Sequence, residues 1–196
     1  MSDNAKFSRD RFDKFDSKAK KWSKVLLEQL GARSVTKTKG NERYDLEASV
    51  NGKPMKFEVE VKQDWGKQWK VSASEDGWMV SGKKSDMPFP FPDIRYTARK
   101  KDNPVDYFIT FSGCGKYALM APSEDVKKSK IQKIDNKHMS NEPFMVFSLK
   151  FPNKFAFFEL GDEGWFMIFH WCGRRPKCLS FDNVFDPMSD CLFLDY

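Results

Sequence analysis

The stretch that decides the fold runs from Arg43 to Lys62. It reads RYDLEASV over residues 43–50, NGKPM over 51–55 and KFEVEVK over 56–62. Apolar and polar residues alternate strictly in the first and last of these segments, which is typical of β-strands with one buried face. Asn51-Gly52 is the strongest short-range signal for a two-residue turn. We therefore predict an antiparallel hairpin in which Val50 faces Lys53.

The two faces of this predicted hairpin differ in chemistry. One face is apolar apart from a phenol and is expected to pack on the core: Tyr44, Leu46, Ala48, Val50, Phe57, Val59 and Val61. The other face carries charged side chains: Asp45, Glu47, Glu58, Glu60 and Lys62. Asp45 and Glu60 are diagonal neighbours, about 7–8 Å apart at the backbone, so their side chains can reach one ion. Such an acidic cluster suits Mg²⁺, which favours carboxylate oxygens and water. The alternative is a solvated sheet face with ordinary surface ion pairs.

A long helix is expected before the hairpin. Apolar residues from Phe12 to Leu30 recur at three- and four-residue steps, and Gly31 stands where a left-handed cap ends a helix. A helix, then Asp45 on one strand, then Glu60-Val61-Lys62 on the next, resembles the PD-(D/E)XK nuclease superfamily. That superfamily includes restriction endonucleases and Holliday-junction resolvases. The resemblance covers roughly Phe12 to Lys62 and implies an α/β fold, with a mixed β-sheet flanked by helices in an order beginning helix, strand, strand, strand.

The resemblance also implies a role for each residue of the motif. Asp45 would be the motif aspartate and a metal ligand, Glu60 the second ligand, and the backbone carbonyl of Val61 a third. Lys62 would orient the attacking water or help to deprotonate it, and would stabilise charge that develops on the phosphate. The cofactor would be Mg²⁺ or Mn²⁺, because a metal-bound water becomes a nucleophile near neutral pH. Tyr44 stands where the family name has proline, and no helix is recognisable after the third strand, since residues 64–84 read as a loop.

The rest of the chain reads as one domain over residues 1–196, with residues 1–11 as a flexible N-terminus. Residues 63–101 form a long irregular stretch, and the chain becomes β-rich from Asp106. Ser123 is expected to cap a short basic helix over residues 123–134. Further strands are predicted over Tyr107–Phe111, Tyr117–Ala121, Phe144–Phe151, Phe155–Leu160 and Trp165–Trp171, and LFLDY at the C-terminus is a candidate last strand. The expected fold is therefore a restriction-endonuclease-like core with a β-rich C-terminal half.

The charge and composition of the chain limit the classes of partner that it can bind. Lys and Arg number 34 against 28 Asp and Glu, and this net charge of +6 permits a nucleic-acid partner. Candidate phosphate contacts are Arg99, Lys100, Lys101, Lys127 and Lys128, with solvated surfaces as the alternative. No apolar stretch approaches the roughly 20 residues that a membrane helix needs, so no membrane contact is expected.

The cysteines and the N-terminal sequence indicate the cellular compartment in which the protein is expected. Cys114, Cys172, Cys178 and Cys191 contain no CxxC pair, and the N-terminus has no apolar signal core. We therefore expect reduced thiols and a cytoplasmic protein. His170 with Cys172 and Cys178 is more typical of a buried β core than of a zinc site, whose ligands are usually spaced more tightly.

These observations and the resemblance together predict a Mg²⁺-dependent deoxyribonuclease that acts on DNA. A homodimer is compatible with this, because cutting both strands usually needs two sites, although the sequence shows no interface. A phage origin would suit a small nuclease. Two alternatives from other classes stay open. One is a nucleic-acid-binding module without catalysis on the same fold, and the other is a structural or interaction protein with a Phe-rich β core.

Overall fold

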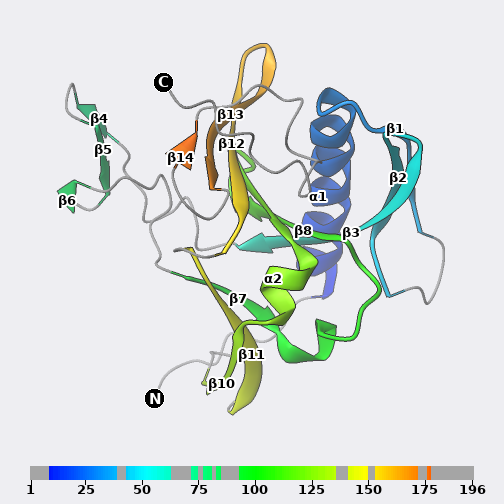
Figure 1. Cartoon of the computed structure of the whole chain (residues 1–196), viewed down its shortest axis with the longest axis vertical. Coiled ribbons are helices and arrows are strands. Elements are labelled where there is room, and N and C mark those ends of the chain that lie inside the picture. Colours follow the sequence, from blue (N-terminus) through cyan, green and yellow to red (C-terminus); the bar gives the residue numbers. More distant parts are fainter. Residues whose placement is uncertain are drawn as a thin grey trace, which may run out of the picture.

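The computed structural model describes residues 9–38, 43–62, 72–74, 77–80, 83–84, 93–135, 141–149, 153–171 and 176–177. These residues form a mixed α/β fold that consists mostly of strands, with a curled main sheet, two smaller sheets and few helices (Figure 1). The predicted α/β class, the mixed sheet and the β-rich second half are therefore confirmed.

The main sheet has eight strands in the order β1-β2-β3-β8-β9-β12-β13-β14. Their bounds are β1 (Arg33–Lys37), β2 (Leu46–Val50), β3 (Lys53–Lys62), β8 (Tyr107–Ser112), β9 (Tyr117–Pro122), β12 (Phe155–Gly161), β13 (Gly164–Trp171) and β14 (Pro176–Lys177). Only β3 and β8 pair in parallel; the other neighbouring strands are antiparallel. A parallel pair needs a long crossover, so the chain leaves the sheet after Lys62 and returns at Tyr107.

The hairpin of β2 and β3 has the predicted register. Leu46 opposes Phe57 and Val50 opposes Lys53. Asn51 and Gly52 both have positive φ angles, 51° and 78°, as a type I′ turn requires. β2 begins at Leu46, so Asp45 lies just outside the regular strand. Tyr44, predicted to share the apolar face, instead packs against the core on the opposite face, because strand alternation does not extend beyond Asp45.

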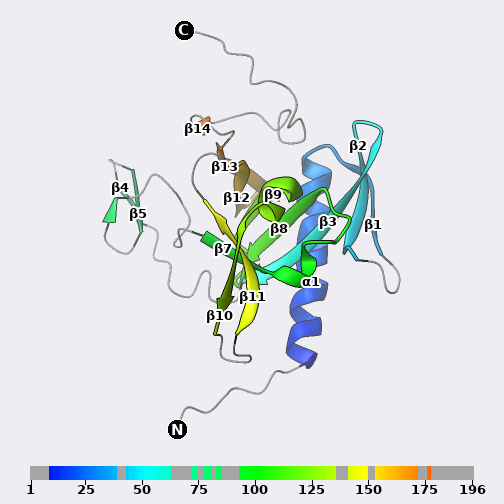
Figure 2. The ribbon, with the colours of Figure 1, turned by 60° about the horizontal axis from the view of Figure 1, so that its bottom comes forward.

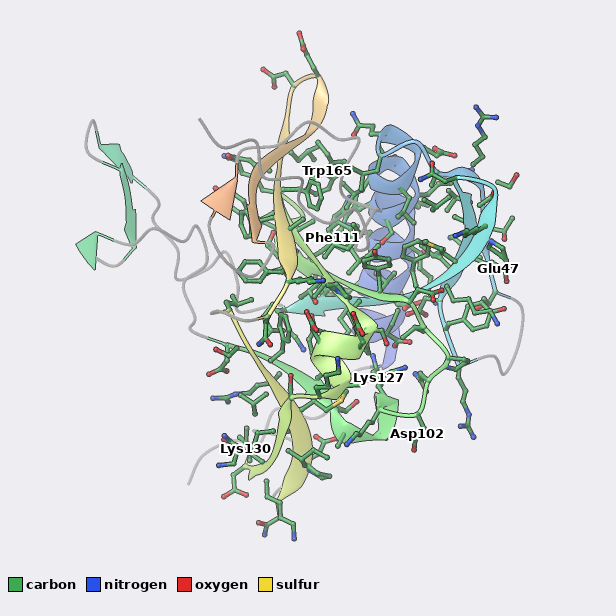
Figure 3. All side chains as sticks on the ribbon, viewed as in Figure 1. Glu47, Asp102, Phe111, Lys127, Lys130 and Trp165 are labelled. Atoms are coloured by element: carbon green, nitrogen blue, oxygen red, sulfur yellow. The ribbon has the colours of Figure 1, made fainter. Side chains whose placement is uncertain are left out.

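One face of the main sheet is covered by the predicted helix, α1 (Arg9–Gln29), which is followed by Gly31 at φ 87°. The core under α1 is apolar, and Leu26, Leu27 and Phe111 in it are fully buried. The rings of Phe111 and Trp165 lie 5.6 Å apart between the sheet and this helix (Figure 3). Dispersion and hydrophobic burial therefore hold this interface together.

The other face is covered by a three-stranded sheet in the order β10-β11-β7 and by two short helices (Figure 2). Their bounds are β7 (Asp93–Thr97), the 3₁₀ helix η1 (Ala98–Lys100), α2 (Ser123–Lys127), β10 (Lys130–Ile134) and β11 (Glu142–Ser148). A second apolar core between these layers contains Tyr96, Phe108 and Phe147, all fully buried. This is also the face toward which Glu58 and Glu60 of β3 extend. This charged face, for which a solvated surface was the alternative, is therefore covered at these two glutamates.

The stretch predicted to be irregular, residues 63–101, contains strands. β7 and η1 form its C-terminal end, and β4 (Ser72–Ser74), β5 (Gly77–Val80) and β6 (Lys83–Lys84) form a small sheet of their own. β7 pairs with β11 along five residues, and Ile94 and Tyr96 alternate with polar residues as in a half-buried strand. Trp65 and Trp69 lie outside the described residues.

The predicted basic helix over residues 123–134 is only partly correct. The helix ends at Lys127, and Lys130–Ile134 is β10, because pairing with β11 overrides the local helix signal. Ser123 is the first helical residue and Pro122 holds the cap position, so Ser123 is not the cap. The other predicted strands are confirmed as β8, β9, β11, β12 and β13. LFLDY, Cys172, Cys178 and Cys191 lie outside the described residues, as do residues 1–8.

Candidate functional site

Glu60 and Lys62 form an ion pair between β3 and the covering sheet. Lys62 Nζ lies 2.5 Å from Glu60 Oε2, and it also donates a hydrogen bond to the backbone carbonyl of Arg95 on β7. The same ammonium lies 5.2 Å from the centroid of the Tyr96 ring, within the range of a cation–π contact. The Glu-x-Lys pair predicted from the sequence is thus formed, and it is fixed against β7.

Lys100 of η1 connects two glutamates of β3. Its Nζ lies 2.6 Å from Glu58 Oε1 and 2.7 Å from Glu60 Oε1. Asn103 Nδ2 donates a longer hydrogen bond of 3.4 Å to the second oxygen of Glu58. Both oxygens of Glu60 therefore face ammonium groups, Oε1 that of Lys100 and Oε2 that of Lys62.

Asp45 lies at the start of β2 and is held on two sides. Its Oδ2 accepts a hydrogen bond of 2.8 Å from the backbone N–H of Val59. Its Oδ1 lies 2.9 Å from Lys20 Nζ, and Lys20 also contacts Asp16 one turn earlier in α1. The Asp45 side chain thus bonds to the β3 backbone just before the first residue of β2 and also contacts α1.

Burial and nearby charges shift the glutamate pKa values in opposite directions. Burial raises the pKa of Glu60, but the positive charges of Lys62 and Lys100 outweigh it and lower the pKa to about 2. Burial also raises the pKa of Glu58, and the negative charges of Asp45 and Glu60 add to this effect while Lys100 opposes it. Glu60 is therefore ionised at neutral pH, and Glu58 is the carboxylate that protonates first as the pH falls.

Lys100 and Lys20 stay charged. Burial lowers the pKa of Lys100, but the charges of Glu60 and Glu58 outweigh it, so the pKa is raised. Burial likewise opposes the charge of Lys20, and its hydrogen bonds to Asp45 and Asp16 raise its pKa. The result is a network of fixed positive and negative groups on both sides of β3.

The donor chemistry of the site suits a hard divalent cation, but the present arrangement favours ammonium. Among the described residues, no group of three or more His, Cys, Asp and Glu is arranged to hold a metal ion. Two carboxylate oxygens nevertheless converge on one positive centre, the Lys100 nitrogen between Glu58 and Glu60. Carboxylate oxygens are the ligands that Mg²⁺ prefers. Glu58 and Glu60 therefore have donor chemistry that fits the ion. Asp45, the other carboxylate of the predicted metal pair, is bound to Val59 and Lys20. Asp45 and Glu60 would therefore both have to exchange lysine contacts for the ion.

The predicted phosphate contacts fall into two groups. Arg99, Lys101 and Lys128 are exposed, as expected for residues that meet a partner, and their proposed contact with DNA stays a prediction. Lys127 donates a hydrogen bond of 2.6 Å to the carbonyl of Asn103. Lys100 is directed inward to Glu58 and Glu60, so its charge is already matched.

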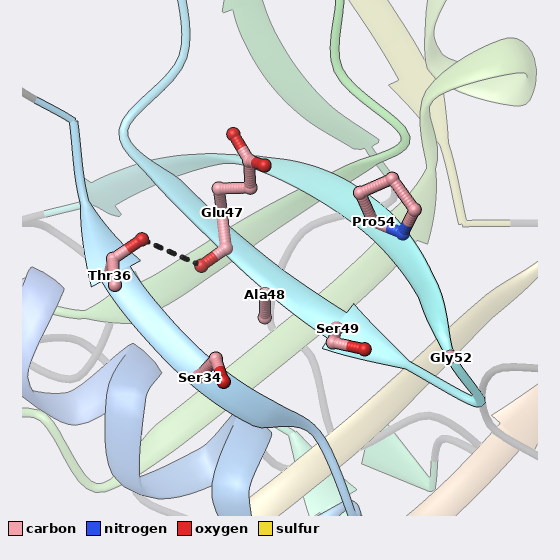
Figure 4. A pocket seen from close by; sticks show the side chains of 7 residues that line it. All are labelled: Ser34, Thr36, Glu47, Ala48, Ser49, Gly52 and Pro54. Carbon is pink, nitrogen blue, oxygen red and sulfur yellow. Dashed lines mark hydrogen bonds between the residues drawn. The ribbon is translucent and has the colours of Figure 1, made fainter.

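A hollow of about 350 Å³ lies toward the turn of the hairpin, lined by residues of β1, β2, the turn and the start of β3 (Figure 4). Thr36 donates a long hydrogen bond of 3.5 Å to the carbonyl of Glu47 there. Its lining is made of small and polar residues, with Glu47 as the ionisable group. A catalytic site normally brings several polar groups together, so the Glu60 cluster is the better candidate.

The roles that Lys20 and Lys100 have in the network were not predicted. Lys20 was expected on a solvated helix face, although the Asp16–Lys20 spacing of one helical turn is a local sign that its ammonium is held. Lys100 was expected at a surface that contacts phosphate. Its inward contact joins residues 40 positions apart, and only the three-dimensional fold reveals it.

Comparisons of the chain with models of protein families, with curated proteins and with solved structures find no significant match. The resemblance to the PD-(D/E)XK superfamily therefore stays a prediction from the sequence motif. None of the described helices is long and apolar enough to cross a bilayer.

Proposed function

We propose that this chain is a metal-dependent endonuclease that hydrolyses DNA phosphodiester bonds through Asp45, Glu60 and Lys62. The observation that carries the proposal is the Glu60–Lys62 pair at the end of β3, with Lys62 Nζ 2.5 Å from Glu60 Oε2. Asp45 stands beside the same strand and bonds to the backbone of Val59. The order α1, β1, β2, β3 supports the proposal, because the resemblance implies a core that begins with a helix and three strands.

Each residue has a defined task in this proposal. Asp45, Glu60 and the carbonyl of Val61 would hold Mg²⁺ or Mn²⁺, which when bound supplies an activated water and polarises the phosphoryl oxygen. Lys62 orients that water, and its ammonium stabilises negative charge developing on the phosphate. The Arg95 carbonyl and the Tyr96 ring keep the Lys62 ammonium in place. Glu60 stays ionised throughout the neutral range because its pKa is about 2.

Lys100 has to yield for this site to work. It contacts Glu60 Oε1 at 2.7 Å and thereby holds one of the two oxygens of the proposed ligand. Lys100 holds this oxygen through one contact of its side chain, so a change of the Lys100 rotamer would free the oxygen. Lys100 then remains close to the carboxylates as an additional positive charge for a bound phosphate.

A second candidate function is a nucleic-acid-binding module without catalysis. The observation that favours it is that both oxygens of Asp45 and both oxygens of Glu60 already have partners. In that case the ion pairs only join α1, β3 and β7, and the basic surface contacts nucleic acid.

Cleavage of supercoiled plasmid and of a labelled four-way junction tests the proposal. The assay uses Mg²⁺, Mn²⁺ or EDTA and compares the natural chain with Lys62→Ala and with Lys53→Ala, an exposed lysine on the same strand. We expect metal-dependent nicking that falls by about 100-fold or more in Lys62→Ala, the scale of losing one charge-stabilising group. Lys53→Ala should cleave normally.

Two results would overturn the proposal. Absence of cleavage in both metals, by folded protein that still binds DNA, would establish the binding module instead. Cleavage by Lys62→Ala at the rate of Lys53→Ala would show that the assigned site is wrong. Titration calorimetry with Mn²⁺ on the natural chain and on Asp45→Asn adds a readout independent of cleavage, and binding should weaken in the variant.

A further inference from the structure

A second hollow borders the candidate site on the side of η1. It has a volume of about 590 Å³ and is lined by Arg43, Arg99, Lys100, Asp102 and Asn103. This volume lies within the range of small-ligand sites, roughly 300–1,000 Å³. Arg43 precedes β2, and the other four residues come from η1 and the turn after it, so the fold brings together two segments far apart in sequence. We call it the Arg43–Arg99 hollow.

The hollow has an excess of positive charge. The charge of Lys100 is matched by Glu58 and Glu60. Arg43 and Arg99 are exposed, and within the described part of the chain neither of them has an acidic partner within ion-pair distance. Asp102 is the acidic residue of the lining. The lining thus contributes two guanidinium groups and one carboxylate besides Lys100 and Asn103. The planar fork of a guanidinium matches the oxygens of a phosphate.

Two residues that line the hollow also contact the glutamates of the candidate site. Lys100 lines the hollow and holds both Glu58 and Glu60, and Asn103 lines it and donates to Glu58. On the other side, Arg43 lies two residues before Asp45. A phosphate in the hollow would therefore lie next to the side chains that hold Glu58 and Glu60.

We propose that the Arg43–Arg99 hollow binds a backbone phosphate of a nucleic-acid strand and thereby positions a neighbouring phosphodiester at the candidate active site. The positioning role rests on the proposed function, whereas phosphate binding does not need catalysis. Phosphodiester is favoured over an acidic peptide because the hollow adjoins groups suited to phosphate chemistry. Arg43 and Arg99 are binding residues here, and Lys100 is the side chain common to both sites.

Fluorescence anisotropy with a labelled oligonucleotide in EDTA measures this binding without cleavage. The double variant Arg43→Gln/Arg99→Gln is compared with Arg33→Gln/Lys37→Gln, which removes two exposed basic residues from β1, outside the hollow. We expect the first variant to weaken binding by about tenfold or more, and the slope of log affinity against log salt to fall by about one. The β1 variant should bind almost as the natural chain does.

Equal losses in the two double variants would overturn the proposal, because they would mean general attraction to a basic surface. Competition by polyglutamate as effective as competition by unlabelled oligonucleotide would also overturn it, in favour of an acidic protein partner. Thermal unfolding of each variant verifies that it is folded.

The outcomes for the hollow and for the nuclease are separable. If the natural chain never cleaves but Arg43→Gln/Arg99→Gln still weakens oligonucleotide binding, the hollow stands and the nuclease proposal fails. If metal-dependent cleavage occurs with the same KM in the Arg43→Gln/Arg99→Gln variant, and binding is unchanged, the nuclease stands and the hollow is refuted.

Discussion

The two faces of the main sheet are covered in different ways, and one strand contributes to both. β3 sends Phe57 and Val59 into the apolar core under α1. Its alternate residues Glu58 and Glu60 extend toward η1 and β7 and are held there by lysines. The same alternation that makes a strand amphipathic has thus produced two covered faces of different chemistry.

The difference between the two faces identifies buried residues of β3 and η1 that the stability of the fold does not require to be charged. Apolar side chains fill the interface between the sheet and α1. Apolar side chains, among them Phe108 and Phe147, also fill much of the interface on the β7 face. Three charged residues lie within this otherwise apolar interface: Glu58, Glu60 and Lys100. Well-packed apolar residues would be equally or more stable than buried ion pairs, because charges lose hydration on burial. The charged part of the β7 face is therefore the part where a function is expected.

The largest effect is expected on the α1 face. Phe111 is fully buried between the rings of Trp22 and Trp165, each 5.6 Å away. Phe111→Ala should lower the free energy of unfolding by about 3–5 kcal/mol, since it removes a large buried ring and leaves a cavity. Urea unfolding at pH 7 and at pH 4 should give the same loss. A loss that differs strongly between the two pH values would contradict a purely apolar interface.

A somewhat smaller effect is expected on the β7 face, and it should depend on pH. Lys100→Met leaves Glu58 and Glu60 without their shared cation, and breaking such a buried contact costs about 3 kcal/mol at pH 7. The loss should shrink toward pH 4, because protonation then removes the unpaired negative charge. Urea unfolding of Lys100→Met across this range measures it. Lys101→Met is the control: that lysine is exposed, and its loss should stay within about 0.5 kcal/mol.

The third prediction concerns the contribution of Glu60 ionisation to the free energy of unfolding. Its pKa in the folded chain, about 2, is below the ordinary value of 4.5, so its ionisation adds stability above about pH 4.5 that is lost as the pH falls toward 2. Glu60→Gln should therefore be less stable than the natural chain by on the order of 2 kcal/mol at pH 6. This difference should disappear as the pH approaches 2. A constant difference over the range would mean that the carboxylate charge is not stabilised by the lysines.

Glu58→Gln is the matched comparison, because the pKa of Glu58 is raised. A raised carboxyl pKa gives stability that is present below the ordinary value and is lost as the pH rises through the folded value. The pH dependence of Glu58→Gln relative to the natural chain should thus have the opposite sign to that of Glu60→Gln. The same sign for both variants would show that the two glutamates do not differ in environment.

Local sequence patterns predicted the hairpin that carries Asp45, Glu60 and Lys62, but they did not predict the contacts that Lys20 and Lys100 make with it. Alternation and Asn51-Gly52 were sufficient for the hairpin register, because both act between near neighbours. The direction of the Asp45 side chain depends on where β2 begins and on Lys20 of α1, which residue order alone does not fix. β10 follows from pairing with β11 although its local sequence favours a helix. Lys100 reaches Glu60 only because β7 returns across the face of β3.

The parallel pairing of β3 with β8 also determines the order in which the molecule can fold. The hairpin closes over a two-residue turn, whereas β8 joins β3 only after residues 63–106 have formed a crossover. Closing a long loop costs entropy before its contacts are gained, so contacts of this kind form slowly. Glu60 and Lys62 lie on a strand that can pair through its turn alone. Arg95, Tyr96 and Lys100, which hold them, all lie within the crossover and reach the site only when it closes.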